Sequence, residues 1–220
     1  MTHKAAFLIA LLGAVLPLQA QTLDKFQIGT AATVGNTNNW PAAEAPGNAI
    51  DLNSATKYLN FGKLNTGYIL TYPSAVTANG LALTTANDAV ERDPASFSLY
   101  GSTTVVANGT PGSTFKLSDF TLIVNSQALS LPATRLTAAG VESFTNATAY
   151  TTYLLVFPTV KTPGSANSMQ IADAVLTNGG TAISTAGTTI GGGQLIPEPA
   201  SALLLGTASV SVLGLRRRRK

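Results

Sequence analysis

Between residues 21 and about 176, hydrophobic residues come in short runs divided by turn-forming residues, and no helical i, i+3, i+4, i+7 spacing persists. The runs are rich in Tyr, Phe, Leu, Val and Thr. Asn-Gly, Asp-Pro and Pro-Gly pairs, which favour turns, divide them. The pattern predicts an all-β sandwich with strands at residues 68–72, 80–85, 96–100, 120–124, 150–157 and 169–176.

One run should lie at the centre of a sheet. Residues 153–157 show no polar alternation, which is typical of a strand covered on both faces. Pro158 follows directly and should end this strand, because proline cannot donate a hydrogen bond to the neighbouring strand.

The composition narrows the chemistry. The chain has 220 residues, 10% of them charged, with no Cys and one His at position 3. It is long enough for one domain. If the first twenty residues are removed, the remainder lacks both His and Cys, which excludes Ser-His-Asp and Cys-His nucleophiles, His-ligated zinc and disulfides.

The positive net charge of the chain comes from its end. Five of the thirteen basic residues are the last five, whereas residues 21–195 hold seven basic and nine acidic residues. A nucleic-acid partner is therefore not expected, because such proteins cluster Lys and Arg on a folded face.

The N-terminus has the features of a secretory signal. A basic start is followed by an apolar run to Leu18 and the small residue Ala20. This order predicts a signal peptide at residues 1–20, cut by signal peptidase after Ala20. The alternative is a short N-terminal core helix.

The C-terminus predicts a short hydrophobic transmembrane helix. Residues 200–215 carry no charge and would form a helix of about 24 Å, which can span a bilayer if the flanking arginines snorkel. The basic cluster that follows should keep this end cytoplasmic; its arginines are Arg216, Arg217, Arg218 and Arg219. The alternative is a plain anchor.

Residues 196–220 resemble the PEP-CTERM sorting signal of exported bacterial proteins. The resemblance consists of Pro197-Glu198-Pro199, the apolar segment and the terminal arginines, in that order. It implies processing by exosortase, an integral-membrane protease. The chain would then be anchored transiently in the inner membrane and afterwards reach the cell surface or the extracellular polymer. Residues 179–195 are rich in Thr and Gly without any charge, and they predict a flexible linker between this signal and a domain at residues 21–178.

The domain itself resembles the discoidin or coagulation-factor type C family. The resemblance is carried by residues 44–58, 83–102 and 166–173, and it spans about residues 34–178. It implies a galactose-binding-like jelly-roll sandwich, a fold shared with carbohydrate-binding modules. Two departures are Leu52, where the family usually has glycine, and the absence of the disulfide of many eukaryotic members.

The same resemblance implies a structural calcium ion. Its ligands would be Asn48, Asp51, Asn53, Thr56 and Asp173. A separate argument also singles out Asp173, because in a strand it would share a face with Met169, Ile171 and Val175. A carboxylate on an apolar face needs a cation or several donors. The alternatives are a salt bridge to Arg92 or Arg135, or a solvated face.

Sugar binding would require an exposed aromatic ring and groups that fix hydroxyls. The candidates are Trp40, in an Asn-rich loop, and Tyr58; the alternative for the single Trp is core packing.

Asp88, Glu91 and Asp93 crowd together and could serve glycoside hydrolysis, although turn formation and ion pairing with Arg92 explain them better. The sequence therefore predicts an exported, non-enzymatic module for carbohydrate binding or adhesion, with extracellular polysaccharide as partner. The alternatives are a purely structural matrix protein and a glycoside hydrolase.

Overall fold

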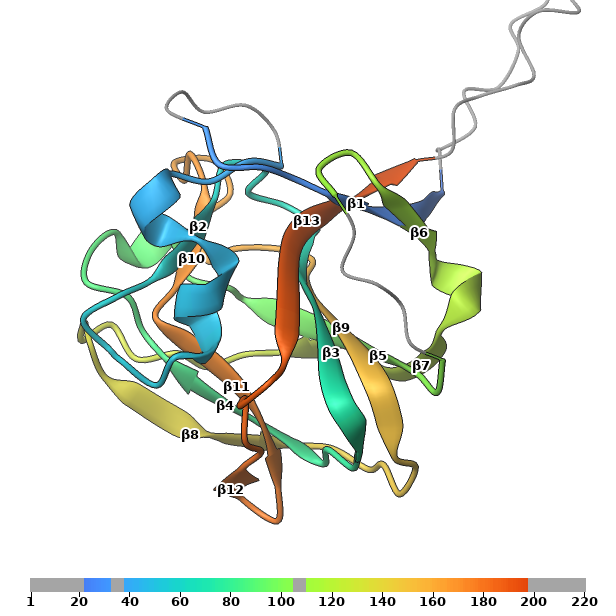
Figure 1. Cartoon of the computed structure of the whole chain (residues 1–220). Helices are drawn as coiled ribbons and strands as arrows, with labels where there is room; N and C mark the ends of the chain where they lie inside the picture. Colours follow the sequence, from blue (N-terminus) through green and yellow to red (C-terminus); the bar gives the residue numbers. More distant parts are fainter. Residues whose placement is uncertain (1–21, 33–37, 105–109, 198–220) are drawn as a thin grey trace, which may run out of the picture. The chain divides into compact units, whose positions relative to one another are not determined.

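The fold is built almost entirely of strands (Figure 1). The computed structural model describes residues 22–32, 38–104 and 110–197, and within them thirteen strands and four 3₁₀ helices. The strands are β1 Leu23–Ile28, β2 Tyr58–Asn60, β3 Thr66–Val76, β4 Gly80–Thr84, β5 Ser96–Ser102, β6 Thr114–Lys116, β7 Thr121–Ala128, β8 Ala138–Ser143, β9 Tyr150–Phe157, β10 Met169–Ile171, β11 Asp173–Asn178, β12 Thr181–Ala182 and β13 Thr189–Pro197. The helices are η1 Ala42–Glu44, η2 Pro46–Ile50, η3 Val90–Arg92 and η4 Leu117–Asp119.

The strands form a sandwich. A seven-stranded sheet has the order β6-β1-β13-β3-β9-β5-β7, a four-stranded sheet has the order β12-β11-β4-β8, and β10 pairs with β2. The strand pairs of the sheets are antiparallel. From β3 to β5 and from β7 to β9 the chain passes from the larger sheet to the smaller and back. This alternation is typical of a jelly roll, and it confirms the predicted all-β sandwich.

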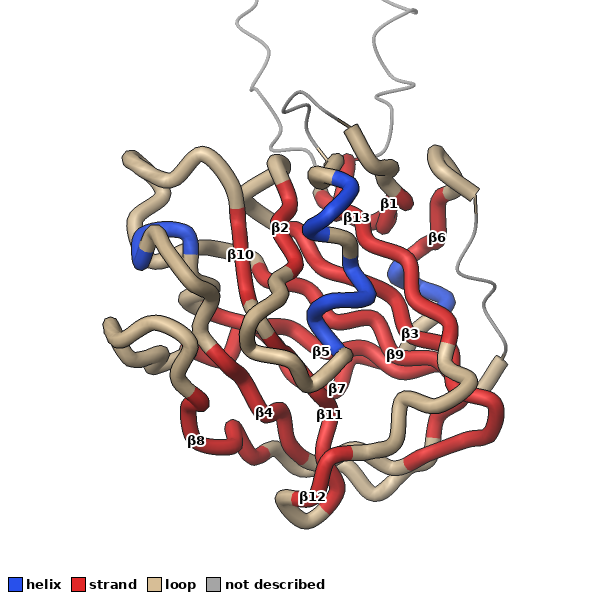
Figure 2. Tube along the Cα trace, turned by 60° about the vertical axis from the view of Figure 1, so that its left-hand side comes forward, coloured by secondary structure: helices blue, strands red, loops and turns tan. Residues whose placement is uncertain are grey.

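Five of the six predicted runs each lie largely on one strand. Residues 150–157 coincide with β9, which lies between β3 and β5 in the middle of the larger sheet (Figures 1 and 2). Seven of its eight residues are buried, as expected for a strand covered on both faces. β9 ends at Phe157, immediately before Pro158.

The run at residues 169–176 is not one strand but two. Met169 and Ile171 on β10 point into the main core, and after Ala172 the core positions become Ala174 and Leu176 on β11. The break at Ala172 therefore changes which alternate residues face inward. The prediction that Asp173 shares a face with Met169 and Ile171 is wrong, because Asp173 lies on the outer face of the smaller sheet with Val175.

The segment expected to be a flexible linker is part of the sandwich. Residues 189–197 form β13, which pairs with β1 on one side and β3 on the other. Its glycines serve close packing: a Cβ atom on Gly192 would lie 2.5 Å from Cγ of Pro46 and 2.7 Å from Oη of Tyr58. A linker at residues 179–195 and a domain end at residue 178 are therefore wrong, because glycine here makes room for neighbours.

The domain ends with paired strands. Pro197, the last residue of β13, is in register with Leu23 at the start of β1. The signal peptide with Ala20 lies outside the described residues, as do Glu198, Pro199, the apolar segment and the terminal arginines. No helix in residues 22–32, 38–104 or 110–197 is long and apolar enough to cross a membrane.

Candidate functional site

One hollow lies where β1 ends. We call it the loop-end pocket; it measures about 190 Å³ and is lined by Gln27, Ile28, Gly29, Thr30, Asn38, Asn39, Pro111 and Gly112. None of these side chains is charged. The lining thus offers neutral hydrogen-bonding groups beside two apolar side chains.

Gly29 allows this pocket to form. A Cβ atom at position 29 would lie only 1.6 Å from the backbone oxygen of Asn38, so any other residue would push the loop away. Backbone hydrogen bonds from Ala32 to Trp40 and from Trp40 to Thr30 hold the loop against the end of β1, with N···O distances of 2.8 and 3.3 Å. Asn38 adopts a left-handed backbone with φ of 71°, which asparagine tolerates better than most residues.

The two asparagine side chains are held in place by the backbone. The amide nitrogen of Asn38 donates to the backbone oxygen of Gln27 at 2.9 Å. The side-chain oxygen of Asn39 accepts from the backbone N–H of Thr30 at 3.2 Å. Sequence reasoning found this loop and its amides, and it selected the aromatic Trp40 as the main ligand contact.

Trp40 and Tyr58 do not form the predicted sugar platform. Trp40 is 9% exposed and Tyr58 is fully buried, and both belong to the main core. Their rings meet edge to face with centroids 6.2 Å apart, and burial raises the pKa of the Tyr58 hydroxyl. A ring buried on both faces cannot stack on a sugar, so the ligand role predicted for these two residues is wrong.

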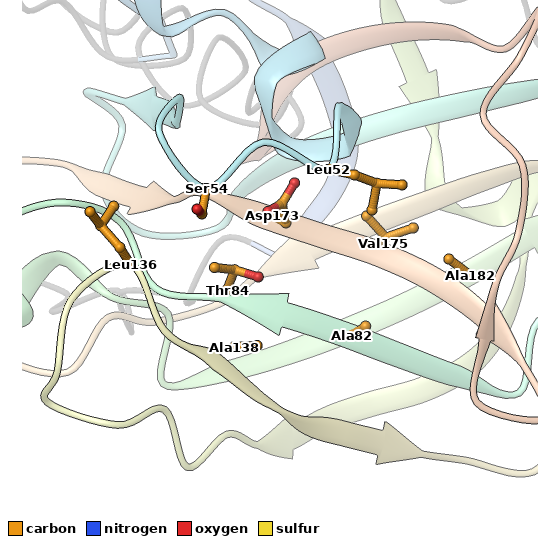
Figure 3. Close-up of a pocket in the computed structure, with 9 residues that line it drawn as sticks. All are labelled: Leu52, Ser54, Ala82, Thr84, Leu136, Ala138, Asp173, Val175 and Ala182. Carbon is orange, nitrogen blue, oxygen red and sulfur yellow. The ribbon is translucent and has the colours of Figure 1, made fainter.

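A second hollow lies on the outer face of the smaller sheet (Figure 3). We call it the sheet-face hollow; it measures about 300 Å³ and is lined by Leu52, Ser54, Ala82, Thr84, Leu136, Ala138, Asp173, Val175 and Ala182. In Figure 3, Asp173 of β11 lies between the loop that carries Leu52 and Ser54 and the neighbouring Thr84 of β4. Most of the other lining side chains are aliphatic.

Asp173 lacks a counter-charge. It is only 6% exposed, and its Oδ1 atom is buried without a hydrogen-bond partner among the described residues. Burial raises the pKa of Asp173, and the negative charge of Asp51 raises it further, whereas the Leu52 backbone N–H and the Thr84 hydroxyl lower it. Two carboxylates thus lie close together, and no salt bridge is seen to either in the described part of the chain.

Of the five predicted calcium ligands, Asp173 lines this hollow, whereas Asp51 and Thr56 belong to the loop that carries Leu52 and Ser54. The Oδ2 atom of Asp51 accepts from the hydroxyl of Thr56 at 2.7 Å, and Asp51 is close enough to Asp173 to affect its pKa. The unpaired carboxylate oxygen, the second carboxylate and the hydroxyl are donors that calcium accepts. Within the described ranges, no three acidic, His or Cys side chains converge, so backbone oxygens would have to complete the site.

Asn48 and Asn53, the two asparagines among the predicted calcium ligands, form hydrogen bonds with nearby backbone groups. The amide nitrogen of Asn48 donates to the backbone oxygens of Ala43 and Lys57, both at 2.9 Å. The side-chain oxygen of Asn53 accepts from the backbone N–H of Ala55. Leu52, where the resembled family has glycine, keeps a left-handed φ of 60° and is 65% exposed.

The acidic cluster forms ion pairs. Asp93 is fully buried, with its two oxygens 2.6 and 2.8 Å from the Arg135 guanidinium and one oxygen 3.2 Å from Nζ of Lys161. Asp88 pairs with Lys57 at 2.9 Å; burial favours a higher pKa, but Lys57 and Arg92 leave the pKa of Asp88 below its usual value. Arg92 and Arg135 are thus engaged with Asp88 and Asp93, and neither bridges Asp173.

Comparison with known proteins gives distant likenesses only. No protein-family model matches the sequence, and no curated protein matches it. A family 32 carbohydrate-binding module of Clostridium perfringens, CpGH89CBM32-5, in complex with GalNAc-β-1,3-galactose, is 13% identical, with a TM-score of 0.42 over 60% of this chain and 81% of that one. The family 32 module of C. perfringens NanJ in complex with galactose is 11% identical, with a TM-score of 0.44 over 62% and 87%.

A third solved structure is chitosan-binding module 1 of a chitosanase/glucanase from Paenibacillus sp. IK-5. It is 14% identical, with a TM-score of 0.43 over 66% of this chain and 96% of that one. Likenesses this distant assign neither a ligand nor an activity to the chain. The sandwich is established by the strand pairing of the chain itself.

Proposed function

We propose that the domain is a non-catalytic module that binds neutral polysaccharide through its loop end. The observation that carries this proposal is the loop-end pocket, whose lining combines amide, hydroxyl and backbone groups without a charged side chain. Sugar hydroxyls both donate and accept hydrogen bonds, and such groups can fix them.

The ion pairs argue against glycoside hydrolysis. That reaction needs one carboxylic acid and one carboxylate across a cleft. Asp93 is fully buried between Arg135 and Lys161, and Asp88 is held by Lys57. Lys57 and Arg92 hold the pKa of Asp88 below its usual value, so Asp88 is poorly suited to act as a general acid, and Asp93 is enclosed by its two ion-pair partners.

Affinity electrophoresis tests the proposed binding. Full-length protein would run in native gels cast with dextran, galactomannan or alginate, beside a protein that binds none of them. We expect retardation in at least one neutral gel, dextran or galactomannan. Unchanged mobility in all three gels would favour a structural matrix protein.

We further propose that the chain is exported and sorted by an exosortase-type protease at Pro197-Glu198-Pro199, as the sequence resemblance implies. Replacing Glu198 by Ala, or deleting Arg216–Arg219, should leave uncut protein in the membrane fraction. Normal processing of both variants would count against sorting.

We also propose that a calcium ion binds at Asp51, Thr56 and Asp173. The ion would connect the loop that carries Asp51 to β11.

A further inference from the structure

We propose that the loop-end pocket holds one neutral sugar residue of a polysaccharide between the side-chain carbonyl of Asn38 and the side-chain NH₂ group of Asn39. This inference rests on the proposed function and names the contact atoms and the ligand class for the same site.

The carbonyl of Asn38 lacks a partner. The side chain is 6% exposed and lines the loop-end pocket, yet its Oδ1 atom has no hydrogen-bond donor within the described ranges. A buried polar atom without a partner is unfavourable, so such atoms usually meet a water molecule or a ligand.

The orientation of this amide follows from its other contact. The backbone oxygen of Gln27 can only accept, so the group that lies 2.9 Å from it must be the NH₂ of Asn38. The carbonyl oxygen is then fixed on the remaining side of the amide. This carbonyl oxygen needs an N–H or O–H donor. Every sugar hydroxyl has an O–H that can donate.

Asn39 supplies the complementary group. Because its oxygen accepts from the backbone N–H of Thr30, its NH₂ group is the part left to donate. Neighbouring residues thus present one acceptor and one donor at the same pocket. Two hydroxyls on one sugar ring can satisfy both, the first by donating to Asn38 and the second by accepting from Asn39.

Size and charge define the ligand class. The volume of about 190 Å³ is below the roughly 300–1,000 Å³ of pockets for drug-sized ligands, which favours a single sugar unit. No lining side chain is cationic, so a uronic acid would lose hydration of its carboxylate without gaining a counter-charge. The exposed Pro111 ring supplies apolar contact for the carbon face of the sugar.

A glycine substitution isolates the Asn38 side chain. Asn38→Gly keeps a residue that readily adopts the left-handed φ of 71°, so the loop backbone should persist while the carbonyl is lost. Asn65→Gly is the matched control: it makes the same change at a φ of 57°, at a residue that does not line the pocket. Asn39→Ala is the second variant, and it keeps the proposal testable if Asn38→Gly fails to fold.

Dissociation constants would be measured for the full-length variants by affinity electrophoresis in dextran and galactomannan, with alginate as the acidic polymer. We expect Asn38→Gly and Asn39→Ala to raise the dissociation constant for the neutral polysaccharide by tenfold or more. Asn65→Gly should have the dissociation constant of wild type. Wild-type binding by folded Asn38→Gly and Asn39→Ala would overturn this inference and leave carbohydrate binding standing elsewhere. Retardation of wild type by alginate alone would overturn the neutral ligand class, and no retardation of wild type would overturn the proposed function as well.

Discussion

The loop-end pocket and the sheet-face hollow differ in what their polar groups lack. In the pocket, the carbonyl of Asn38 is buried without a donor among the described residues, and none of the lining side chains that the structure describes is charged. In the hollow, a carboxylate oxygen of Asp173 is buried without a partner in the same described ranges, and the charge of Asp51 acts on it. A hydrogen-bond donor completes the first arrangement, whereas a positive charge completes the second.

Because the two hollows differ in this way, calcium binding and sugar binding are assigned to separate places on the domain. Calcium and sugar were both expected from one family resemblance, yet Asp173 lines the sheet-face hollow, Asn38 and Asn39 line the loop-end pocket, and the two have no lining residue in common. Each property can therefore be removed without the other.

Asp93 is a buried aspartate that has its counter-charges, and its removal should show how much such a carboxylate contributes to the free energy of unfolding. Asp93→Ala leaves Arg135 and Lys161 without their carboxylate, and we expect it to lower the free energy of unfolding by about 3–5 kcal/mol. Urea denaturation of the full-length protein measures this change. Asp119→Ala, at an exposed residue, is the control, and a loss for Asp93→Ala as small as that of the control would contradict the structural role.

Calcium should stabilise the protein through the sheet-face hollow. At a free concentration a hundredfold above its Kd, a ligand adds about 2.7 kcal/mol, which raises the melting temperature of a domain of this size by several degrees. We expect this shift between millimolar calcium and chelator in wild type and in Asn38→Gly, and its loss in Asp51→Ala. A calcium shift of wild-type size in Asp51→Ala would place the ion elsewhere.

Asp173→Asn should act in the opposite direction when calcium is removed. Burial and the charge of Asp51 hold the pKa of Asp173 above its value in the unfolded chain, so wild type loses stability as pH rises through that pKa. In chelator at neutral pH, we expect the variant to melt about 2–4 °C higher, a gain of about 1 kcal/mol. Toward acidic pH the gain should vanish, because Asp173 is then also neutral. A variant that melts below wild type at neutral pH would show that the carboxylate is satisfied in the protein.

Salt should have the smallest effect. Because no charged side chain lines the loop-end pocket, raising NaCl from 50 to 500 mM should change the dissociation constant for dextran or galactomannan by less than about twofold. Affinity electrophoresis at the two salt concentrations measures this. A weakening of tenfold would mean that ionic contacts outside the pocket bind the polymer.

The strands were predictable where burial dominates their sequence. Residues 150–157 contain little but apolar side chains and Thr, and they form β9 in the middle of the larger sheet. β13 could not be predicted, because three consecutive glycines are typical of linkers. In this fold Gly192 lies beside Pro46 and Tyr58 and Gly193 lies beside Phe26, and only the tertiary arrangement makes glycine necessary at these two positions.

The sequence predicted part of the candidate site and missed features that depend on the tertiary arrangement. The sequence singled out the Asn-rich loop, and the family resemblance placed Asp51 and Asp173 in one predicted ligand set. Composition could not tell that Trp40 turns into the core, because this depends on Gly29 and Gly192 leaving room for its ring. The face of Asp173 depended on the break at Ala172, and a simple alternation of inward and outward residues cannot foresee such a break.

Thermal melts of the full-length protein test the separation of the two hollows most directly. The protein would be melted in chelator, in millimolar calcium, in dextran or galactomannan with chelator, and in calcium with the same polysaccharide. We predict an upward shift with each ligand, and a combined shift close to the sum of the two, because the hollows share no lining residue. No shift with either ligand would contradict both assignments, and a polysaccharide shift that requires calcium would contradict their independence.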